Sequence, residues 1–221
     1  MRTVLFDSLQ AWWPEAILSL GALVVIVLGA ATKRQRPTLL ATWVTLLASA
    51  VALWAAPVLP ETATFFGLIL CDPFSVVFRW LALGTTAIVV LMVMGSNEVA
   101  ERSRGEYLGL LLCVAVGLMV MAEATHLLMA YVAMELVSLS AYVLVGLVGD
   151  ERSAEASLKY LIFGALASGI MLFGMSLLFG LTGSLAFADI REATTGLSGS
   201  MGAVLLLAIA LMLAGLAFKI S

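Results

Sequence analysis

The sequence predicts an all-α protein, a polytopic bundle of transmembrane helices. Apolar residues make up 63% of its 221 residues and charged residues only 11%, whereas soluble domains average about 45–50% and about 25%. Most of the apolar segments have the ~20-residue length that crosses a bilayer. We expect one transmembrane domain over residues 1–221, with spans at about 15–32, 38–56, 74–95, 107–122, 126–148, 157–181 and 201–221.

Two segments between these spans are too short to cross a membrane. Thr62–Phe74 is expected to form a strand or hairpin at the surface. Ser184–Ala193 alternates apolar and charged residues at helical spacing, which predicts a short amphipathic helix at the interface. No polar tail follows Lys219, so we expect the intact protein to continue with further helices.

The orientation is predicted from the basic residues of the short loops, because these are enriched on the cytoplasmic side of membrane proteins. An outside N-terminus leaves seven basic residues inside and three outside. The inner residues are Lys33, Arg34, Arg36, Arg102, Arg104, Arg152 and Lys159, and the outer ones are Arg2, Arg79 and Arg191.

Several classes of site are disfavoured by composition. Two cysteines are too few for a disulfide framework or a four-cysteine iron–sulfur site, and a single histidine argues against haem or zinc. The sequence has no glycine-rich phosphate loop, no Ser/His/Asp arrangement and no basic patch typical of nucleic-acid binding. We therefore expect no cofactor or metal on this chain.

Glu135 is the most informative residue, because it interrupts a segment that belongs in lipid. A charge at the bilayer centre costs at least ~2.5–3.5 kcal/mol, and such residues usually face a bundle interior and handle ions or protons. Tyr131, Ser138 and Tyr142 share a helical face with Glu135. This polar face is expected to point into protein, where it supports proton transfer. The alternative is a structural glutamate that hydrogen-bonds a neighbouring helix and never titrates.

Two lysines lie in comparable settings. Lys159 is near the predicted start of the sixth helix, where a lysine can also extend to the headgroups without any function. Lys219 follows a long uncharged segment. A straight helix from Met201 would bring it ~27 Å along the axis, near the inner surface. A helix that starts outside the bilayer or breaks would bury it.

Small residues spaced by four recur along the sixth predicted helix, at Gly164 and Ser168 and at Ala165 and Gly169. Small side chains allow two transmembrane helices to approach closely. We expect these positions to pack against a neighbouring helix.

Weaker candidates lie near the outer side. Glu123 and His126 flank the start of the fifth helix and are a possible proton exit, or else ordinary interfacial polar residues. Asp72 before Pro73 is expected to cap a helix. Arg79, one turn into the third helix, is expected to anchor that helix at the interface.

The segments around these residues resemble one protein family. AYVAMELVSLSAYVLVGL, with Glu135, and SAEASLKYLIFGALASGIMLFGMSLLFGLTGSL, with Lys159, are similar to the N subunit of bacterial NADH:quinone oxidoreductase, which is respiratory complex I. Its mitochondrial counterpart is NADH dehydrogenase subunit 2. WWPEAILSLGALVVIVLG and AGLAFKIS, with Lys219, fit the same family.

The resemblance implies an antiporter-like fold of fourteen helices, of which about seven are present here. It implies that Glu135, Lys159 and Lys219 translocate protons, driven by redox chemistry in other subunits. NADH, FMN, iron–sulfur clusters and quinone are expected on partner subunits. The chain is then a multi-pass protein of the bacterial inner membrane, with a periplasmic N-terminus, inside a hetero-oligomer of membrane and peripheral subunits.

Two other functions stay open at this point. A related cation/proton antiporter or membrane-bound hydrogenase subunit shares the glutamate and lysine positions. A scaffold subunit that pumps nothing and only packs other membrane subunits is the second alternative.

Overall fold

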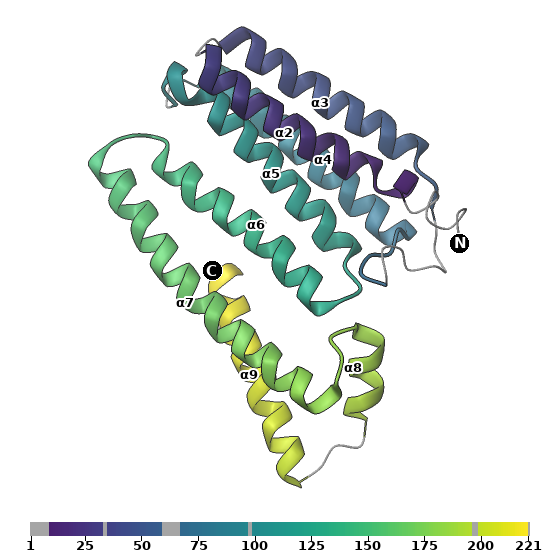
Figure 1. Ribbon diagram of the computed structural model, residues 1–221. Coiled ribbons are helices and arrows are strands. Elements are labelled where there is room, and N and C mark those ends of the chain that lie inside the picture. Colours follow the sequence, from purple (N-terminus) through teal and green to yellow (C-terminus); the bar gives the residue numbers. More distant parts are fainter. Residues whose placement is uncertain (1–8, 33–34, 59–66, 97–98, 196–198, 221) are drawn as a thin grey trace.

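The computed structural model describes residues 9–32, 35–58, 67–96, 99–195 and 199–220, and it confirms the all-α fold. Seven of the described helices are long and apolar enough to cross a membrane. The helices, shown in Figure 1, are α2 (Trp13–Thr32), α3 (Gln35–Ala55), α4 (Pro73–Gly95), α5 (Arg104–Glu123), α6 (Leu127–Gly146), α7 (Glu151–Thr182), α8 (Phe187–Thr194) and α9 (Gly199–Ile220), with a 3₁₀ turn at Glu101–Ser103.

Helix α5 is the centre of the first part of the bundle, where it packs against α2, α3, α4 and α6. Glycines allow the closest approach: a Cβ on Gly105 would lie 2.4 Å from the Cα of Gly29. Helix α6 joins this group to the antiparallel pair α7 and α9 (Figure 1). Apolar side chains form the core between α2, α4 and α5, among them Leu18, Val25, Val90, Leu108, Leu112 and Met119.

The outward faces of the long helices are apolar as well. On α3, Leu40, Leu47 and Val51 are each more than 60% exposed, although leucine and valine normally avoid water. Helices that are hydrophobic all round belong in a membrane or in the core of a large protein. The arrangement therefore fits a multi-pass membrane protein.

Helix α7 begins six residues before the predicted position 157. Asp150 Oδ1 accepts a hydrogen bond from Ser153 N at 2.7 Å, and Ser153 Oγ accepts one from Asp150 N at 3.2 Å. This reciprocal pair is a capping box, which satisfies backbone donors at the helix start. The hydrogen bonds from Ser153 also lower the pKa of the Asp150 carboxyl. Hydropathy missed this start because the first turns are polar although helical.

Helices α2, α4, α6 and α9 begin at the same end of the bundle, which we call the α8 end. The segments that connect the helices there form backbone hydrogen bonds with each other. Ile69 and Ala124 form an isolated β-bridge, as do His126 and Ala186. Within the described residues, the predicted strand or hairpin at 62–74 is reduced to that first bridge, and residues 62–66 lie outside the described part. The predicted amphipathic helix is confirmed as α8.

Helices α7 and α9 meet through two glycines. A Cβ on Gly174 would lie 2.7 Å from Ala208 O, and one on Gly215 would lie 2.6 Å from Ala167 O. Of the predicted small residues, Gly164 and Ser168 are buried. The expectation for Ala165 and Gly169 is wrong: both face outward, because the helices meet on another face of α7.

The long α7 also explains the depth of Lys219. A helix of 32 residues extends ~48 Å, and α9 runs antiparallel to its C-terminal part. Helix α9 is continuous from Gly199 to Ile220, so the burial of Lys219 does not come from a break earlier in this helix. Its last turn ends level with the middle of α7, and Lys219 is buried without reaching the opposite end.

Gly215→Ala should destabilise the α7–α9 contact, because the new methyl group meets Ala167 O at 2.6 Å and Met171 Cβ at 2.7 Å. Overpacking of this kind costs about 1–3 kcal/mol. Gly169→Ala is the matched control, since nothing lies within 4 Å of its Cβ position. Thermal unfolding of the two full-length variants in detergent measures the difference, and equal melting temperatures would contradict this packing.

Asp150→Ala should loosen the first turn of α7, because the Ser153 amide loses its acceptor. Asp150→Asn keeps an acceptor and should preserve the turn. The measurement is hydrogen exchange of the amides of residues 151–155. Because the folded-state pKa of Asp150 is lowered, its stabilising effect is present above the unfolded-state pKa and is lost as pH falls through the folded-state value. Equal exchange in both variants at neutral pH would refute the cap.

Candidate functional site

An acid and an amine from two different helices form an ion pair inside the bundle. Lys219 Nζ lies 2.7 Å from Glu135 Oε1, although 84 residues separate them in sequence. The side chain of Lys219 is 7% exposed and that of Glu135 is 21% exposed. Glu135 lies near the middle of α6. The pair is therefore level with the middle of α6, although Lys219 itself is in the last turn of α9.

Two serine hydroxyls complete the surroundings of this pair. Lys219 Nζ donates to Ser138 Oγ at 2.8 Å, and Ser168 Oγ of α7 donates to Glu135 Oε1 at 2.6 Å. Ser138 lies one turn beyond Glu135 on α6, so both face the end of α9. Three helices thus supply the polar groups that a buried charge pair requires.

The remaining members of the predicted polar face also turn toward protein. Tyr131 OH donates to the backbone O of Ser168 at 3.4 Å. Tyr142 is buried and meets Tyr160 edge-on, with ring centroids 4.5 Å apart. Gly164 leaves room for the Tyr142 hydroxyl, since a Cβ there would lie 1.9 Å from it. The structure therefore turns this face of α6 toward α7 and α9.

A cavity of about 250 Å³ adjoins Lys219. Ser138, Tyr142 and Tyr160 supply its hydroxyl groups, and Met134, Val137 and Leu216 are among its apolar walls. A buried water needs only about 10–15 Å³ of such space together with polar partners. The cavity is large enough to hold water beside the amine.

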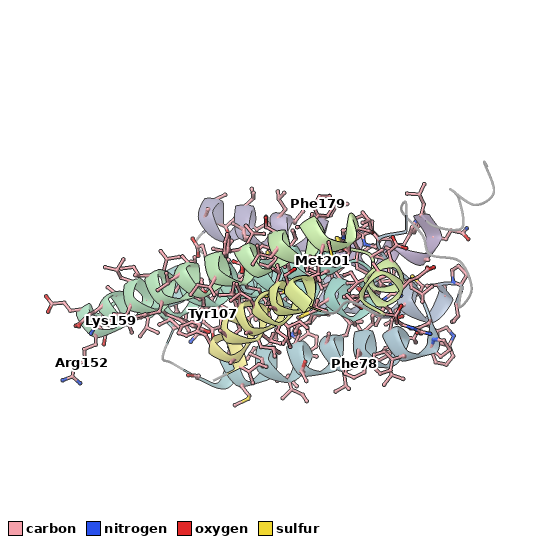
Figure 2. The ribbon with its side chains drawn as sticks, turned by 90° about the horizontal axis from the view of Figure 1, so that it is seen from below. Phe78, Tyr107, Arg152, Lys159, Phe179 and Met201 are labelled. Carbon is pink, nitrogen blue, oxygen red and sulfur yellow. The ribbon has the colours of Figure 1, made fainter. Side chains whose placement is uncertain are left out.

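The structure does not bring Lys159 to this site. Its side chain is 64% exposed and pairs with Glu155, one turn earlier on α7. Figure 2 shows Lys159 and Arg152 at the end of the molecule where α7 begins. Exposed pairs at this spacing contribute only about 0.3–0.5 kcal/mol. Lys159 lies ~12 Å along α7 from its first residue and faces away from the bundle.

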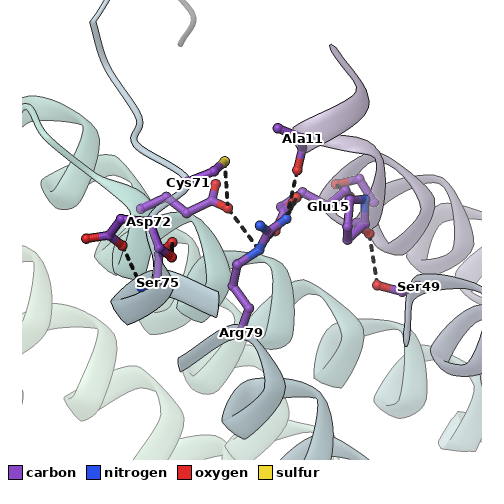
Figure 3. A network of polar contacts seen from close by, with 10 residues as sticks. Ala11, Glu15, Ser49, Cys71, Asp72, Ser75 and Arg79 are labelled. Atoms are coloured by element: carbon purple, nitrogen blue, oxygen red, sulfur yellow. Dashed lines mark hydrogen bonds and ion pairs between the residues drawn. The ribbon is translucent and has the colours of Figure 1, made fainter. Parts of the chain in front are cut away.

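A second buried charged cluster lies at the α8 end (Figure 3). Arg79 of α4 donates to both oxygens of Glu15 on α2, from Nε at 2.8 Å and from Nη2 at 2.7 Å. Its Nε also lies 2.9 Å from Glu123 Oε1 at the end of α5. All three residues are at most 1% exposed. Arg79 is thus no interfacial anchor; the prediction is wrong because two acids from other helices bind it.

Backbone and thiol groups fix this cluster. Arg79 Nη2 donates to Ala11 O at 3.0 Å, and the Cys71 thiol donates to Glu123 Oε1 at 3.6 Å. Burial and the neighbouring Glu123 raise the pKa of the Cys71 thiol to about 12. Asp72 caps α4 as predicted, accepting from Ser75 N at 2.7 Å.

Glu123 and His126 lie at the two ends of the short connection between α5 and α6. Glu123 is buried in the arginine cluster and is not at the surface. His126 precedes α6 as its N-cap residue, and its buried Nδ1 has no partner among the described residues. Glu15 is the residue that sequence reasoning missed. The available signal was the acid Glu15, three residues into one apolar span, together with the base Arg79, seven residues into another.

The comparisons with known proteins agree with this architecture. Residues 124–221 match the family described as NADH:quinone oxidoreductase/Mrp antiporter, transmembrane. The chain is also 36% identical, over 96% of its length, to NADH-quinone oxidoreductase subunit N of Anaeromyxobacter sp. (strain Fw109-5). The chain thus resembles members of that family over nearly its whole length. Both Glu135 and Lys219 lie in the matched region.

Further relatives and solved structures give the same result. Subunit N 1 of Rhizobium meliloti (strain 1021) is 39% identical over 98% of this chain. A chain of respiratory complex I from Thermus thermophilus with bound aureothin superposes with a TM-score of 0.71 at 31% identity, over 92% of this chain and 43% of that one. A chain of the archaeal membrane-bound sulfane sulfur reductase has a TM-score of 0.73 at 23% identity, over 95% of this chain and 44% of that one, and shows the shared fold alone.

The chain is shorter than these relatives. It covers 43% of the Anaeromyxobacter protein and 45% of the Rhizobium protein. The names of these relatives therefore describe proteins more than twice as long as this chain.

Cys71 should resist alkylation in the folded protein at neutral pH. It is fully buried, and a pKa of about 12 leaves roughly one thiol in 10⁵ as thiolate. An Ala188→Cys variant supplies an exposed thiol on α8 as the positive control. Mass spectrometry after maleimide treatment identifies the modified residue, and equal labelling at both positions would contradict the burial of Cys71.

Proposed function

We propose that this chain forms part of the proton-translocating membrane subunit N of NADH:quinone oxidoreductase, with Glu135 and Lys219 as its central proton-transfer pair. One observation carries the proposal: a carboxylate and an amine 2.7 Å apart in the interior of a membrane-spanning bundle. An ionisable residue inside a membrane-spanning bundle is by default a candidate functional residue. The names of the relatives support the same assignment.

The energetics of the pair suit a proton carrier. Breaking a buried ion pair by removing one partner costs about 3–5 kcal/mol. Moving one charge through a membrane potential costs ~2.3 kcal/mol per 100 mV. If Glu135 moved away from Lys219, a penalty of this size would lower the proton affinity of the amine enough to release its proton against such a potential. Restoring the contact favours the protonated amine again.

The surrounding groups provide hydrogen-bond partners for this proton. Ser138 contacts the amine directly, and Tyr142 and Tyr160 line the adjoining cavity. Water in that cavity would connect Lys219 toward the end of the bundle where α7 begins. Ser168 and Tyr131 approach the pair from the α7 side. Lys159 lies outside this path, at the surface of α7, and its part in translocation would be to attract protons to that end.

The assembly and orientation belong to the same proposal. NADH, FMN, iron–sulfur clusters and quinone would be bound by partner subunits, so this chain would contribute no redox centre. It would lie in the bacterial inner membrane with its N-terminus in the periplasm. The distribution of lysine and arginine supports that orientation, which makes the α8 end the outer one.

A cation/proton antiporter subunit is the second candidate, favoured by one observation. The family match at residues 124–221 covers NADH:quinone oxidoreductase and Mrp antiporter proteins alike. The same Glu135–Lys219 pair would then exchange a cation for a proton. Sodium-dependent proton movement in vesicles, without NADH, would favour this candidate.

Glu135→Gln and Lys219→Ala should each reduce proton pumping in inverted membrane vesicles at least several-fold, because each removes one charge of the buried pair. Arg152→Gln, which removes an exposed charge from the start of α7, is the control. Pumping is read from a pH-sensitive dye and divided by the rate of NADH oxidation, which reports assembly. Wild-type pumping in both variants would refute the proposal.

A further inference from the structure

The buried cluster of Glu15, Arg79 and Glu123 contains one negative charge more than it can balance. If both carboxylates are ionised, the three residues together carry −1, and all are at most 1% exposed. An arginine cannot lose its proton in a protein, so the guanidinium contributes no more than +1. Burying an uncompensated charge is costly, and carboxyl groups in that position take up a proton instead.

The hydrogen bonds of Arg79 lead to the same conclusion. Its Nε carries a single hydrogen, yet two carboxylate oxygens lie within reach, Glu15 Oε1 at 2.8 Å and Glu123 Oε1 at 2.9 Å. The Nη2 group is committed to Glu15 Oε2 and Ala11 O. Glu15 therefore has both oxygens on the guanidinium and is the ionised acid, whereas the only contact of Glu123 with the guanidinium is the shared one at Nε.

Glu123 also has an oxygen with no partner. Its Oε2 is buried and makes no hydrogen bond to any described residue. The neighbours add negative charge or remain neutral: Asp72 caps α4 close by, and the Cys71 thiol donates to Glu123 Oε1. His126, on the same connection, pairs its backbone with Ala186 instead. An oxygen without a donor is the one that can carry a hydrogen.

We propose that the Glu15–Arg79–Glu123 cluster is a proton-binding site, which holds one exchangeable proton, chiefly on Glu123, at neutral pH. Binding converts the Glu123 carboxylate into a carboxylic acid and leaves the Arg79–Glu15 ion pair intact. The site is separate from Glu135 and Lys219, because it lies at the α8 end between α2, α4 and α5 (Figure 3). Proton binding here does not depend on the proposed function. If that function holds, the site lies on the side where pumped protons leave.

Infrared spectroscopy tests the proposal on the full-length protein in its native membrane assembly. A protonated carboxyl absorbs at a higher frequency than a carboxylate and shifts when its hydrogen exchanges for deuterium. The wild-type minus Glu123→Gln difference spectrum should show one such band. Glu192→Gln, which changes an exposed glutamate of α8, should show none in that region. Absence of the band in the Glu123→Gln comparison would overturn the proposal.

Two further outcomes sharpen the test. Glutamine is an isostere of a protonated glutamic acid, so the Glu123→Gln assembly should be recovered in wild-type yield; failure to assemble would mean an ionised Glu123 and would overturn the proposal. Glu15→Gln should also abolish the band, because Glu123 then has to ionise to balance Arg79. A band that persists in Glu15→Gln would refute the charge argument. Loss of the carboxyl band in the Glu123→Gln assembly together with normal pumping would support a proton-binding site that is independent of the proposed function.

Discussion

Lipid does not solvate charge, and this constraint governs how the bundle is built. The buried charged residues discussed here are held by partners from other helices: Lys219 by Glu135 and Ser138, and Arg79 by Glu15. Because a charge removed from water needs such partners, each contact fixes the relative position of two helices.

The two buried clusters differ in composition and therefore in behaviour. The pair of Glu135 and Lys219 is balanced, so it is stable while its members touch and becomes costly when they separate. The cluster around Arg79 has one acid too many and is tied down by a bidentate ion pair. A balanced pair suits switching, whereas a rigid, acid-rich cluster suits the retention of a proton. Helices α5 and α6 pack together between the two.

The sequence was sufficient for features that depend on one helix. The polar face of α6 follows from helical spacing, and the Asp72 cap follows from the residue order Asp-Pro. Lys159 and Lys219 look alike in sequence, yet one is exposed and the other is buried. Their depth depends on the length of α7 and on where α9 packs, which no local pattern encodes. The Arg79 cluster was missed for a related reason: its members come from three helices, and the residues of its closest ion pair are 64 positions apart.

The glycines between α7 and α9 set more than a packing distance. Gly174 and Gly215 each pack against a backbone oxygen of the facing helix. Because larger residues do not fit at these contacts, α7 and α9 can pack together in few relative positions along their axes. Advancing α9 by one residue would translate its tip by about 1.5 Å and turn it by about 100°, which would aim the amine away from its acid. A small displacement of α9 along its axis would therefore make or break the contact between Lys219 and Glu135.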